Sequence, residues 1–252
     1  MSPNNCMCGI FGIFNYKNAP NFTYLGLHAL QHRGQESAGI ASIGQDKMNY
    51  HRQMGLVSDI FDKNTLDRLD GYSAIGHVRY STAGSSTIGN AQPLVFEYSK
   101  GPIAIAHNGN LTNAKAVKKE LEDHGSIFQS TADTETIIHL MALSNENTTI
   151  DRLINALHRV EGSYSLVLLT KHELIAARDP YGFRPLALGI LKDSHVVSSE
   201  TCAFDLIEAD YIREVEPGEI IHITKDGLKS YKPFKKVPSR FCIFEYIYFA
   251  RP

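Results

Sequence analysis

The sequence predicts an α+β protein in which two stacked β-sheets are flanked by helices. Short apolar stretches that are separated by Gly, Pro, Asn and Asp predict many strands joined by tight turns. Other stretches repeat apolar residues at helical spacing, and each amphipathic helix has to cover the face of a sheet. Because helices do not alternate regularly with strands, the order favours antiparallel or mixed sheets over a repeated βαβ unit. One domain is expected.

The first elements are a buried strand and a helix. Residues 9–14, GIFGIF, form an uninterrupted apolar run that predicts a strand. Apolar residues then recur at helical spacing within 22–30. Either Asn21 or Thr23 can cap the start of this helix, and Gly34 suits its exit. Further strands are predicted at 38–43, 72–80 and 103–107.

Helices are predicted for the middle of the chain and strands for its last third. Thr112 can cap a helix that Gly125 would end, and a second helix is predicted over 133–143. A third helix shows a clear apolar stripe over 150–160. After Gly162 the apolar period becomes that of short strands. These strands are predicted at 163–170, 173–178, 185–190, 195–199 and 219–224, with a short helix at 202–207.

Composition and charge exclude several classes of protein. The chain has 252 residues, of which 43% are hydrophobic and 21% charged, close to the average for globular proteins. A formal net charge of −2 offers no strong field for nucleic acid or anionic lipid. No apolar run approaches the roughly 20 residues that a transmembrane helix needs, and the N-terminus lacks the features of a signal peptide. These observations predict a cytoplasmic protein with no nucleic acid or membrane partner.

The four cysteines are expected to be reduced thiols. They are Cys6, Cys8, Cys202 and Cys242. An even number allows two disulfides, but a chain of this length without a secretory signal favours thiols. No C-x-x-C pair occurs, so a self-contained zinc site is not expected. Cys202 is interpreted as a packed core thiol.

The stretch CMCGIFGIF, residues 6–14, places two thiols directly before the first strand. A cysteine nucleophile needs a base, because only a small fraction of a thiol is ionised at neutral pH. One candidate base is a histidine such as His107. The other is the cysteine's own α-amino group, which has a pKa of about 8 and becomes available if the preceding residues are removed. Both Cys6 and Cys8 are near enough to the start for this, and the alternative is a buried strand with two inert cysteines.

Polar residues gather in segments that border the predicted strands. The segment AHNGN contains Asn108 and Gly109, whose N–H groups can stabilise a developing oxyanion; the alternative is a tight turn. Arg79 and Asp133 can hold the carboxylate and the ammonium of a free amino acid. Their alternatives are a surface ion pair and a helix N-cap. From the local sequence alone, residues 32–33, His-Arg, are interpreted as the polar end of a helix.

Several motifs occur in an order that matches a known family. They are CGIFGI, LQHRGQESAGI, GHVRYSTAG, NAQPL, AHNGNL and DTE. Together they resemble the class II glutamine amidotransferase domain, with no element missing from Cys8 to Asp133. The resemblance implies the four-layer α/β/β/α sandwich of the N-terminal-nucleophile hydrolases. It also implies that glutamine is hydrolysed to glutamate and ammonia.

The resemblance assigns the nucleophile and the limits of the domain. Cys8 directly precedes GIFG and matches the nucleophile. Residues 1–7 then match a propeptide, and Cys6 is discarded with it when the Cys8 amine is exposed. The glutamine amidotransferase domain is expected to span 8–240. Residues 241–252 are expected to begin the connection to a further domain.

The resemblance also assigns the other functional residues by position. The residues that match the oxyanion hole are Asn108 and Gly109. The residues that match the glutamine-binding positions are Arg33, Arg79 and Asp133. Residues 79–86 match a loop that closes over glutamine.

The later motifs resemble one branch of that family, in which a phosphoribosyltransferase domain follows the glutaminase domain. They are GSYSLVLLT, RDPYGFRPLALG, SSETCAFD, EVEPGE and EYIYFARP. The branch implies that ammonia displaces pyrophosphate from phosphoribosyl pyrophosphate, with Mg²⁺, in the first step of purine synthesis. The full-length enzyme is then a glycosyltransferase and a homo-oligomer. This chain, which stops at Pro252, is expected to be a fragment that makes at most ammonia and glutamate.

Cys242 lies just before EYIYF, where some members of that branch hold one cysteine ligand of a 4Fe–4S cluster. Such a cluster needs four cysteines, so the other three are expected outside this chain. Two alternative functions are kept. One is another class II amidotransferase, and the other is an inactive module that binds glutamine with its propeptide attached.

Overall fold

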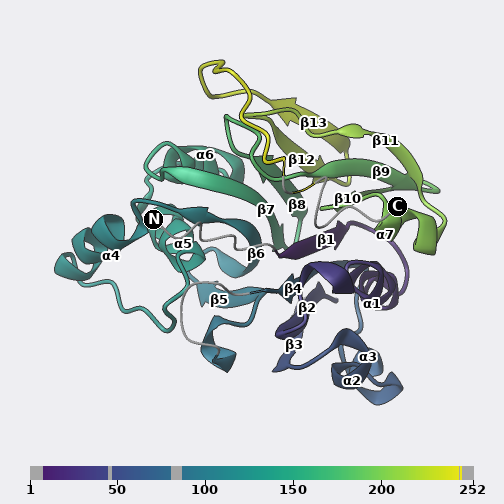
Figure 1. Ribbon diagram of the computed structural model, residues 1–252. Coiled ribbons are helices and arrows are strands. Elements are labelled where there is room, and N and C mark those ends of the chain that lie inside the picture. Colours follow the sequence, from purple (N-terminus) through teal and green to yellow (C-terminus); the bar gives the residue numbers. More distant parts are fainter. Residues whose placement is uncertain (1–7, 45–46, 81–86, 244, 246–252) are drawn as a thin grey trace.

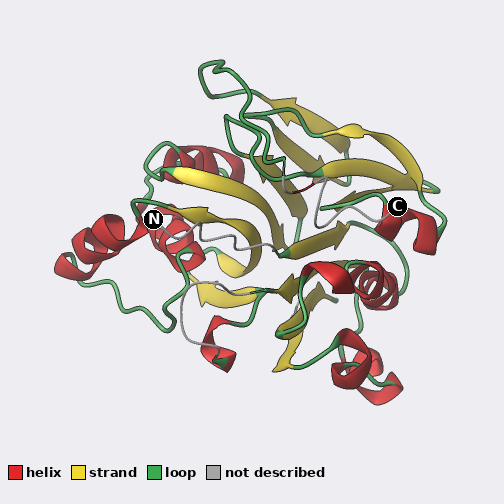
Figure 2. Ribbon diagram, in the orientation of Figure 1, coloured by secondary structure: helices red, strands yellow, loops and turns green. Residues whose placement is uncertain are grey.

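Two antiparallel sheets stack face to face, and helices cover the outer side of each (Figures 1 and 2). The computed structural model describes residues 8–44, 47–80, 87–243 and 245. An apolar core between the sheets is separate from two further cores, one under the helices of each outer side. This arrangement confirms the predicted α+β fold of four layers. No helix in the described residues is long and apolar enough to cross a membrane.

The first sheet has seven strands, and the strand that follows Cys8 lies in its middle. Both faces of that strand are buried, which explains its uninterrupted apolar sequence. Ile10 packs into the core between the sheets, whereas Phe11 and Ile13 pack under the helices. Across the sheet, the strands are β11 (Asp210–Glu214), β9 (Ala187–Leu191), β10 (Ser194–Ser198), β1 (Gly9–Ile13), β4 (Ser73–Arg79), β2 (Ser37–Ile43) and β3 (Met48–Met54).

The second sheet has six strands, and its longest contains the whole segment AHNGN. The expected strand at 103–107 continues to Leu111, because every residue from Ile103 onward pairs with the neighbouring strand. Asn108 therefore lies in a strand, and the interpretation of this segment as a tight turn is wrong. Across the sheet, the strands are β13 (Gly227–Tyr231), β12 (Ile220–Thr224), β8 (Glu173–Arg178), β7 (Gly162–Thr170), β6 (Gly101–Leu111) and β5 (Leu94–Tyr98).

Helices α1 and α7 cover the first sheet, and α4, α5 and α6 cover the second (Figure 1). Gly26 lets α1 approach the sheet closely, since a Cβ there would stand 2.6 Å from the Phe11 ring. The helices are α1 (Ala19–Ala29), α2 (Val57–Ile60), α3 (Lys63–Arg68), α4 (Ala114–Asp123), α5 (Thr134–Leu143), α6 (Thr149–Leu157) and α7 (Cys202–Ile207), with 3₁₀ turns η1 (Gln31–Arg33) and η2 (Ile88–Asn90).

Two helix starts differ from the expected ones. Helix α1 begins after Asn18, so neither Asn21 nor Thr23 caps it. Pro20 lies in its first turn, where the fixed φ of proline favours the helical conformation. Helix α4 begins after Asn113, while the Thr112 hydroxyl donates to the Glu161 carbonyl oxygen instead of capping.

Candidate active site

Cys8 lies where the two sheets meet. It directly precedes β1, and only 2% of its surface is exposed. Its backbone N–H donates to Asn108 Oδ1 over 3.1 Å, and Asn108 belongs to β6 of the other sheet. The Cys8 thiol lies 3.9 Å from the carbonyl oxygen of Tyr80, which follows β4. The fold thus brings residues 100 positions apart to the same point.

The Asn108 side chain has one satisfied atom and one unsatisfied atom. Its residue is fully buried, and Oδ1 accepts the Cys8 N–H. Among the described residues, Asn108 Nδ2 has no hydrogen-bond partner. An unsatisfied buried donor costs about 1–3 kcal/mol, so this N–H group gains free energy when a bound group accepts its hydrogen. An N–H donor held beside a thiol is the arrangement that stabilises the oxyanion of acyl transfer.

Gly109 follows Asn108 at a position where no side chain fits. A Cβ atom there would overlap the carbonyl oxygen of Ser163 in β7 and stand 2.6 Å from His107 Nε2. The close approach of β6 and β7 therefore requires glycine at this position. The expected oxyanion residues Asn108 and Gly109 are adjacent in one strand, next to Cys8.

Arg33 holds the backbone of Cys8 from the opposite side. Its Nε donates to the Cys8 carbonyl oxygen over 2.9 Å, and the side chain is almost fully buried. Its two terminal nitrogens bind the carboxylates of Glu200 and Glu245, the latter over 2.8 Å. Burial alone would lower the pKa of Arg33, but Glu245 and Glu200 raise it above its ordinary value. Arg33 is therefore a charged group that positions Cys8.

Arg79 and Asp133 approach the site from different layers. Side chains alternate along β4, so Arg79 and His77 share the face that turns toward the second sheet. Arg79 forms an ion pair with Glu36. Asp133 precedes α5, and its carboxylate accepts the N–H groups of Leu111, over 2.7 Å, and of Thr134, over 2.8 Å.

The environment of Asp133 favours its charged form. Burial would raise the pKa of this carboxyl, but His107 and the two backbone N–H groups bring it below the ordinary value. The His107 Nδ1 atom lies 3.6 Å from the carboxylate. Asp133 is thus held as an anion next to β6, which suits the expected contact with an ammonium group.

His107 contacts the second sheet and its helices through both ring nitrogens. Nδ1 lies 3.0 Å from the Thr134 hydroxyl, and Nε2 lies 3.4 Å from the Ser163 carbonyl oxygen. These contacts favour a structural role for His107 over the alternative role of base for the thiol. His77, which sequence analysis did not select, lies in β4 and contacts the His107 carbonyl oxygen over 3.2 Å.

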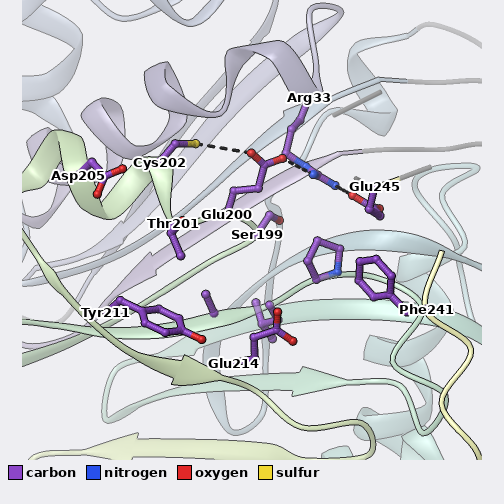
Figure 3. A pocket seen from close by; sticks show the side chains of 13 residues that line it. Arg33, Ser199, Glu200, Thr201, Cys202, Asp205, Tyr211, Glu214, Phe241 and Glu245 are labelled. Atoms are coloured by element: carbon purple, nitrogen blue, oxygen red, sulfur yellow. Dashed lines mark hydrogen bonds and ion pairs between the residues drawn. The ribbon is translucent and has the colours of Figure 1, made fainter. Parts of the chain in front are cut away.

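Glu200 and Glu245 are the site residues that the sequence analysis missed. Glu245 also binds Arg184 over 2.9 Å, so one buried carboxylate joins two arginines. The two glutamates line a cavity of about 290 Å³ on the far side of Arg33 (Figure 3). Both occur in quoted motifs, SSETCAFD and EYIYF, but nothing in the local sequence indicates that they meet Arg33.

Three expectations fall wholly or partly outside the described residues. They concern the propeptide 1–7 with Cys6, the glutamine loop beyond Tyr80, and the connecting segment after Glu245. Cys242 is described and half-buried, and its N–H donates to the Phe183 carbonyl oxygen over 3.4 Å. In the described part of the chain, no set of three potential metal ligands includes Cys242. A cluster there would need its other ligands from elsewhere.

Comparisons with known proteins agree on one family. A sequence profile described as a glutamine amidotransferase domain matches residues 77–205. The amidophosphoribosyltransferase of Bacillus subtilis (strain 168) is 47% identical over 246 residues, covering 97% of this chain and 52% of that protein. Amidophosphoribosyltransferase 1, chloroplastic, of Arabidopsis thaliana is 50% identical over 247 residues, covering 97% of this chain and 44% of that protein.

A solved structure described as the allosteric regulatory enzyme of purine biosynthesis has the same fold. It superimposes with a TM-score of 0.94 at 47% identity, covering 97% of this chain and 53% of the other. This chain thus spans about half the length of the relatives that it matches.

Proposed function

Because this chain belongs to the glutamine amidotransferase domain family, we propose that it is the glutaminase domain of an amidophosphoribosyltransferase and hydrolyses glutamine to glutamate and ammonia. The observation that carries the proposal is the contact of Cys8 with Asn108. One amide side chain binds the nitrogen of Cys8 through Oδ1, while its buried Nδ2 has no partner among the described residues. A thiol, a potential base and an oxyanion donor therefore meet at one point.

The mechanism begins with removal of residues 1–7, which converts the Cys8 nitrogen into a free amine. That amine takes the thiol proton, directly or through a water molecule, since its pKa of about 8 makes it a competent base at neutral pH. The thiolate then attacks the side-chain carbonyl carbon of glutamine. Asn108 Oδ1 keeps the amine in place during this step, because it already accepts the N–H of that nitrogen.

The attack leaves a tetrahedral intermediate with a negative oxygen. Asn108 Nδ2 and the Gly109 N–H donate to it, and each well-placed donor contributes about 3 kcal/mol. The carbon–nitrogen bond breaks, the amine returns its proton, and ammonia leaves. The remaining γ-glutamyl thioester on Cys8 is hydrolysed by water to glutamate, which restores the thiol.

Two charged side chains, the buried Arg79 and the partly buried Asp133, are proposed to select glutamine. Arg79 binds the α-carboxylate and Asp133 binds the α-ammonium. The lowered pKa of Asp133 supports this role because the carboxyl stays ionised at neutral pH. Arg79 is already paired with Glu36, so glutamine has to join or displace that ion pair. Arg33, which contacts Cys8, supports the site through the nucleophile.

We propose a second activity for a full-length protein that contains this domain, because the relatives are about twice as long and two of them are named amidophosphoribosyltransferase. In that proposal a second domain would use the ammonia, with Mg²⁺, to convert phosphoribosyl pyrophosphate to phosphoribosylamine, as the first step of purine synthesis. The same proposal includes two further points. The full-length protein is a cytoplasmic homo-oligomer, and Cys242 is one ligand of a 4Fe–4S cluster. The description of one solved relative as an enzyme of purine biosynthesis supports the assignment of the reaction.

Glutaminase assays combined with intact mass test the proposal. We expect activity to appear together with the loss of residues 1–7, to vanish in Cys8→Ala, and to survive in Cys6→Ala. Hydrolysis by a chain that still carries residue 7 would instead support a histidine base. A processed chain that binds glutamine without hydrolysing it would support the inactive module, and use of another ammonia acceptor would support another class II amidotransferase.

A further inference from the structure

Three side chains with metal-binding atoms converge on the far side of Arg33 from Cys8. They are His32 in η1, Glu200 just after β10, and Cys202 at the start of α7. One nitrogen, one carboxylate oxygen and one sulfur lie within 4.8 Å of one another. We propose that these residues form a binding site for a divalent transition metal, and that Zn²⁺ fits it best.

The hydrogen bonds of His32 point to a cation at this place. Nδ1 lies 3.1 Å from the Ala29 carbonyl oxygen, and Nε2 lies 2.9 Å from Glu200 Oε2. Both oxygens accept hydrogen bonds, whereas a neutral imidazole has only one N–H to donate. With that N–H on Nδ1, the lone pair of Nε2 faces a carboxylate. A cation between Nε2 and Oε2 removes this conflict, and it is either a proton or a metal ion.

The bond to Ala29 is the one that a metal-binding histidine usually makes. Such a histidine donates its other ring N–H to a carbonyl or carboxylate, which fixes the ring and its tautomer. Here the Ala29 carbonyl oxygen fixes the ring of His32. The same carbonyl oxygen lies 3.7 Å from the Cys202 sulfur, so one backbone group orients two of the three ligands.

The distances from Glu200 to the other two ligand atoms are close to those around a tetrahedral zinc ion. Zinc binds nitrogen and oxygen at about 2.0–2.2 Å and sulfur at about 2.3 Å, which separates a tetrahedral N–O pair by roughly 3.4 Å and an O–S pair by roughly 3.6 Å. Cys202 Sγ lies 3.6 Å from Glu200 Oε2. The His32–Glu200 pair, at 2.9 Å, has to open by roughly 0.5 Å. The mixed nitrogen, oxygen and sulfur ligands favour zinc over magnesium or calcium.

The cavity beside the three ligands leaves a coordination position open. Glu200 and Cys202 both line the space of about 290 Å³, and Figure 3 shows them in one wall together with Arg33. A water molecule can enter there as the fourth ligand, which is the arrangement of zinc sites with three protein ligands. Asp205 and Glu214 add negative charge to the lining, which attracts a cation.

The site has a direct route to the nucleophile. One carboxylate oxygen of Glu200 faces His32, while the other binds Arg33, whose Nε holds the Cys8 carbonyl oxygen. A bound metal ion would withdraw charge from Glu200 and weaken its pairing with Arg33. The sequence did not predict this site, because a C-x-x-C search finds only ligands that are neighbours in the chain. His32 and Glu200 are 168 positions apart.

Cobalt titration of the purified, metal-stripped chain tests the site. Co²⁺ bound to a thiolate gives a charge-transfer band in the near ultraviolet, and a tetrahedral site gives visible d–d bands. We expect one Co²⁺ per chain with both signals, and displacement by Zn²⁺. Removal of a residue that only supports a metal ligand weakens metal binding by about 10–100-fold. Removal of a ligand itself, Cys202 or His32, should therefore weaken Co²⁺ binding by more than about 100-fold.

The variants separate this site from other thiols. Cys202→Ala and His32→Ala should lose the cobalt signals, while Cys242→Ala and a Cys6→Ala, Cys8→Ala double variant should keep them. Zn²⁺ should raise the melting temperature of the parent and of Cys242→Ala but not that of Cys202→Ala, whose own circular dichroism spectrum reports its folding. Absence of the charge-transfer band in the parent, or its persistence in Cys202→Ala, overturns the proposal.

Discussion

His77 in β4 and the backbone carbonyl oxygen of His107 in β6 are 3.2 Å apart, and this contact joins the two sheets one residue before Asn108. Because a carbonyl oxygen only accepts, His77 Nε2 carries the hydrogen. His77 is fully buried, and burial lowers its pKa to about 3. It therefore stays neutral at neutral and mildly acidic pH.

This buried histidine predicts a loss of stability in mild acid. The unfolded chain takes up a proton at His77 near its ordinary pKa of about 6.5, whereas the folded chain does so only near 3. Between these values the unfolded state binds more protons, so this group lowers the free energy of unfolding by about 1.4 kcal/mol for each unit by which the pH falls. We expect His77→Gln, which keeps an N–H donor, to lack that part of the slope in urea unfolding between pH 6 and 4. Equal slopes for the two proteins would contradict the burial of a neutral His77.

The Asn108 amide predicts a loss of catalysis without a loss of glutamine binding. Asn108→Asp keeps the oxygen that accepts the Cys8 N–H but replaces the Nδ2 donor by a second oxygen. Removal of one oxyanion donor costs about 10²–10³ in kcat. We expect kcat for glutamine hydrolysis to fall by that factor while KM changes little. Asn108→Ala, which removes the oxygen as well, should in addition disturb the position of Cys8. An Asn108→Asp variant with normal kcat would remove Asn108 Nδ2 from the mechanism.

The carboxylate of Glu245 predicts a large effect on stability. It is 4% exposed and binds both Arg33 and Arg184. Breaking a buried pair by removing one charge costs about 3–5 kcal/mol, because the partner charge stays buried. We therefore expect Glu245→Gln to lower the free energy of unfolding by that amount and to reduce kcat through Arg33. The matched control is Glu216→Gln, which breaks an ion pair with Lys232 in which both side chains are more than half exposed.

A small effect is expected for the control, since exposed pairs contribute about 0–1 kcal/mol. Both variants are compared in one chemical denaturation series. If Glu245→Gln and Glu216→Gln destabilise the protein equally, Glu245 does not support Arg33 in the way that its contacts indicate.

The strands that sequence analysis missed are the four edge strands, β3, β5, β11 and β13. A central strand is buried on both faces and reads as a continuous apolar run, such as GIFGI. An edge strand is half-exposed and carries polar residues, as in MNYHRQM and DYIRE, so its pattern resembles that of a loop. The number of strands was therefore underestimated, although the layers were predicted correctly.

The residues of the candidate site also differ in how far the local sequence indicates them. Cys8, Asn108 and Gly109 were selected because the short motifs that contain them resemble those of the family, and the structure brings Cys8 and Asn108 into contact. Glu245 was missed because its role depends on a contact with Arg33, 212 positions away. Local sequence specifies which groups are present, whereas the crossing of the two sheets determines which of them meet.

We expect the addition of a single methyl group at Gly109 to disrupt the site. A Cβ atom at this position would overlap the Ser163 carbonyl oxygen and crowd His107 Nε2, so Gly109→Ala has to push β6 away from β7. Crowding of this kind costs about 1–3 kcal/mol in stability. It also moves the Gly109 N–H and the neighbouring Asn108 out of line with Cys8, so kcat should fall by at least about tenfold. The control is Gly89→Ala, where the one described atom within 4 Å of a Cβ would be the Thr87 hydroxyl oxygen, at 3.9 Å. We expect that variant to keep its melting temperature and activity. Full activity of Gly109→Ala would show that the spacing of β6 and β7 does not set the oxyanion geometry.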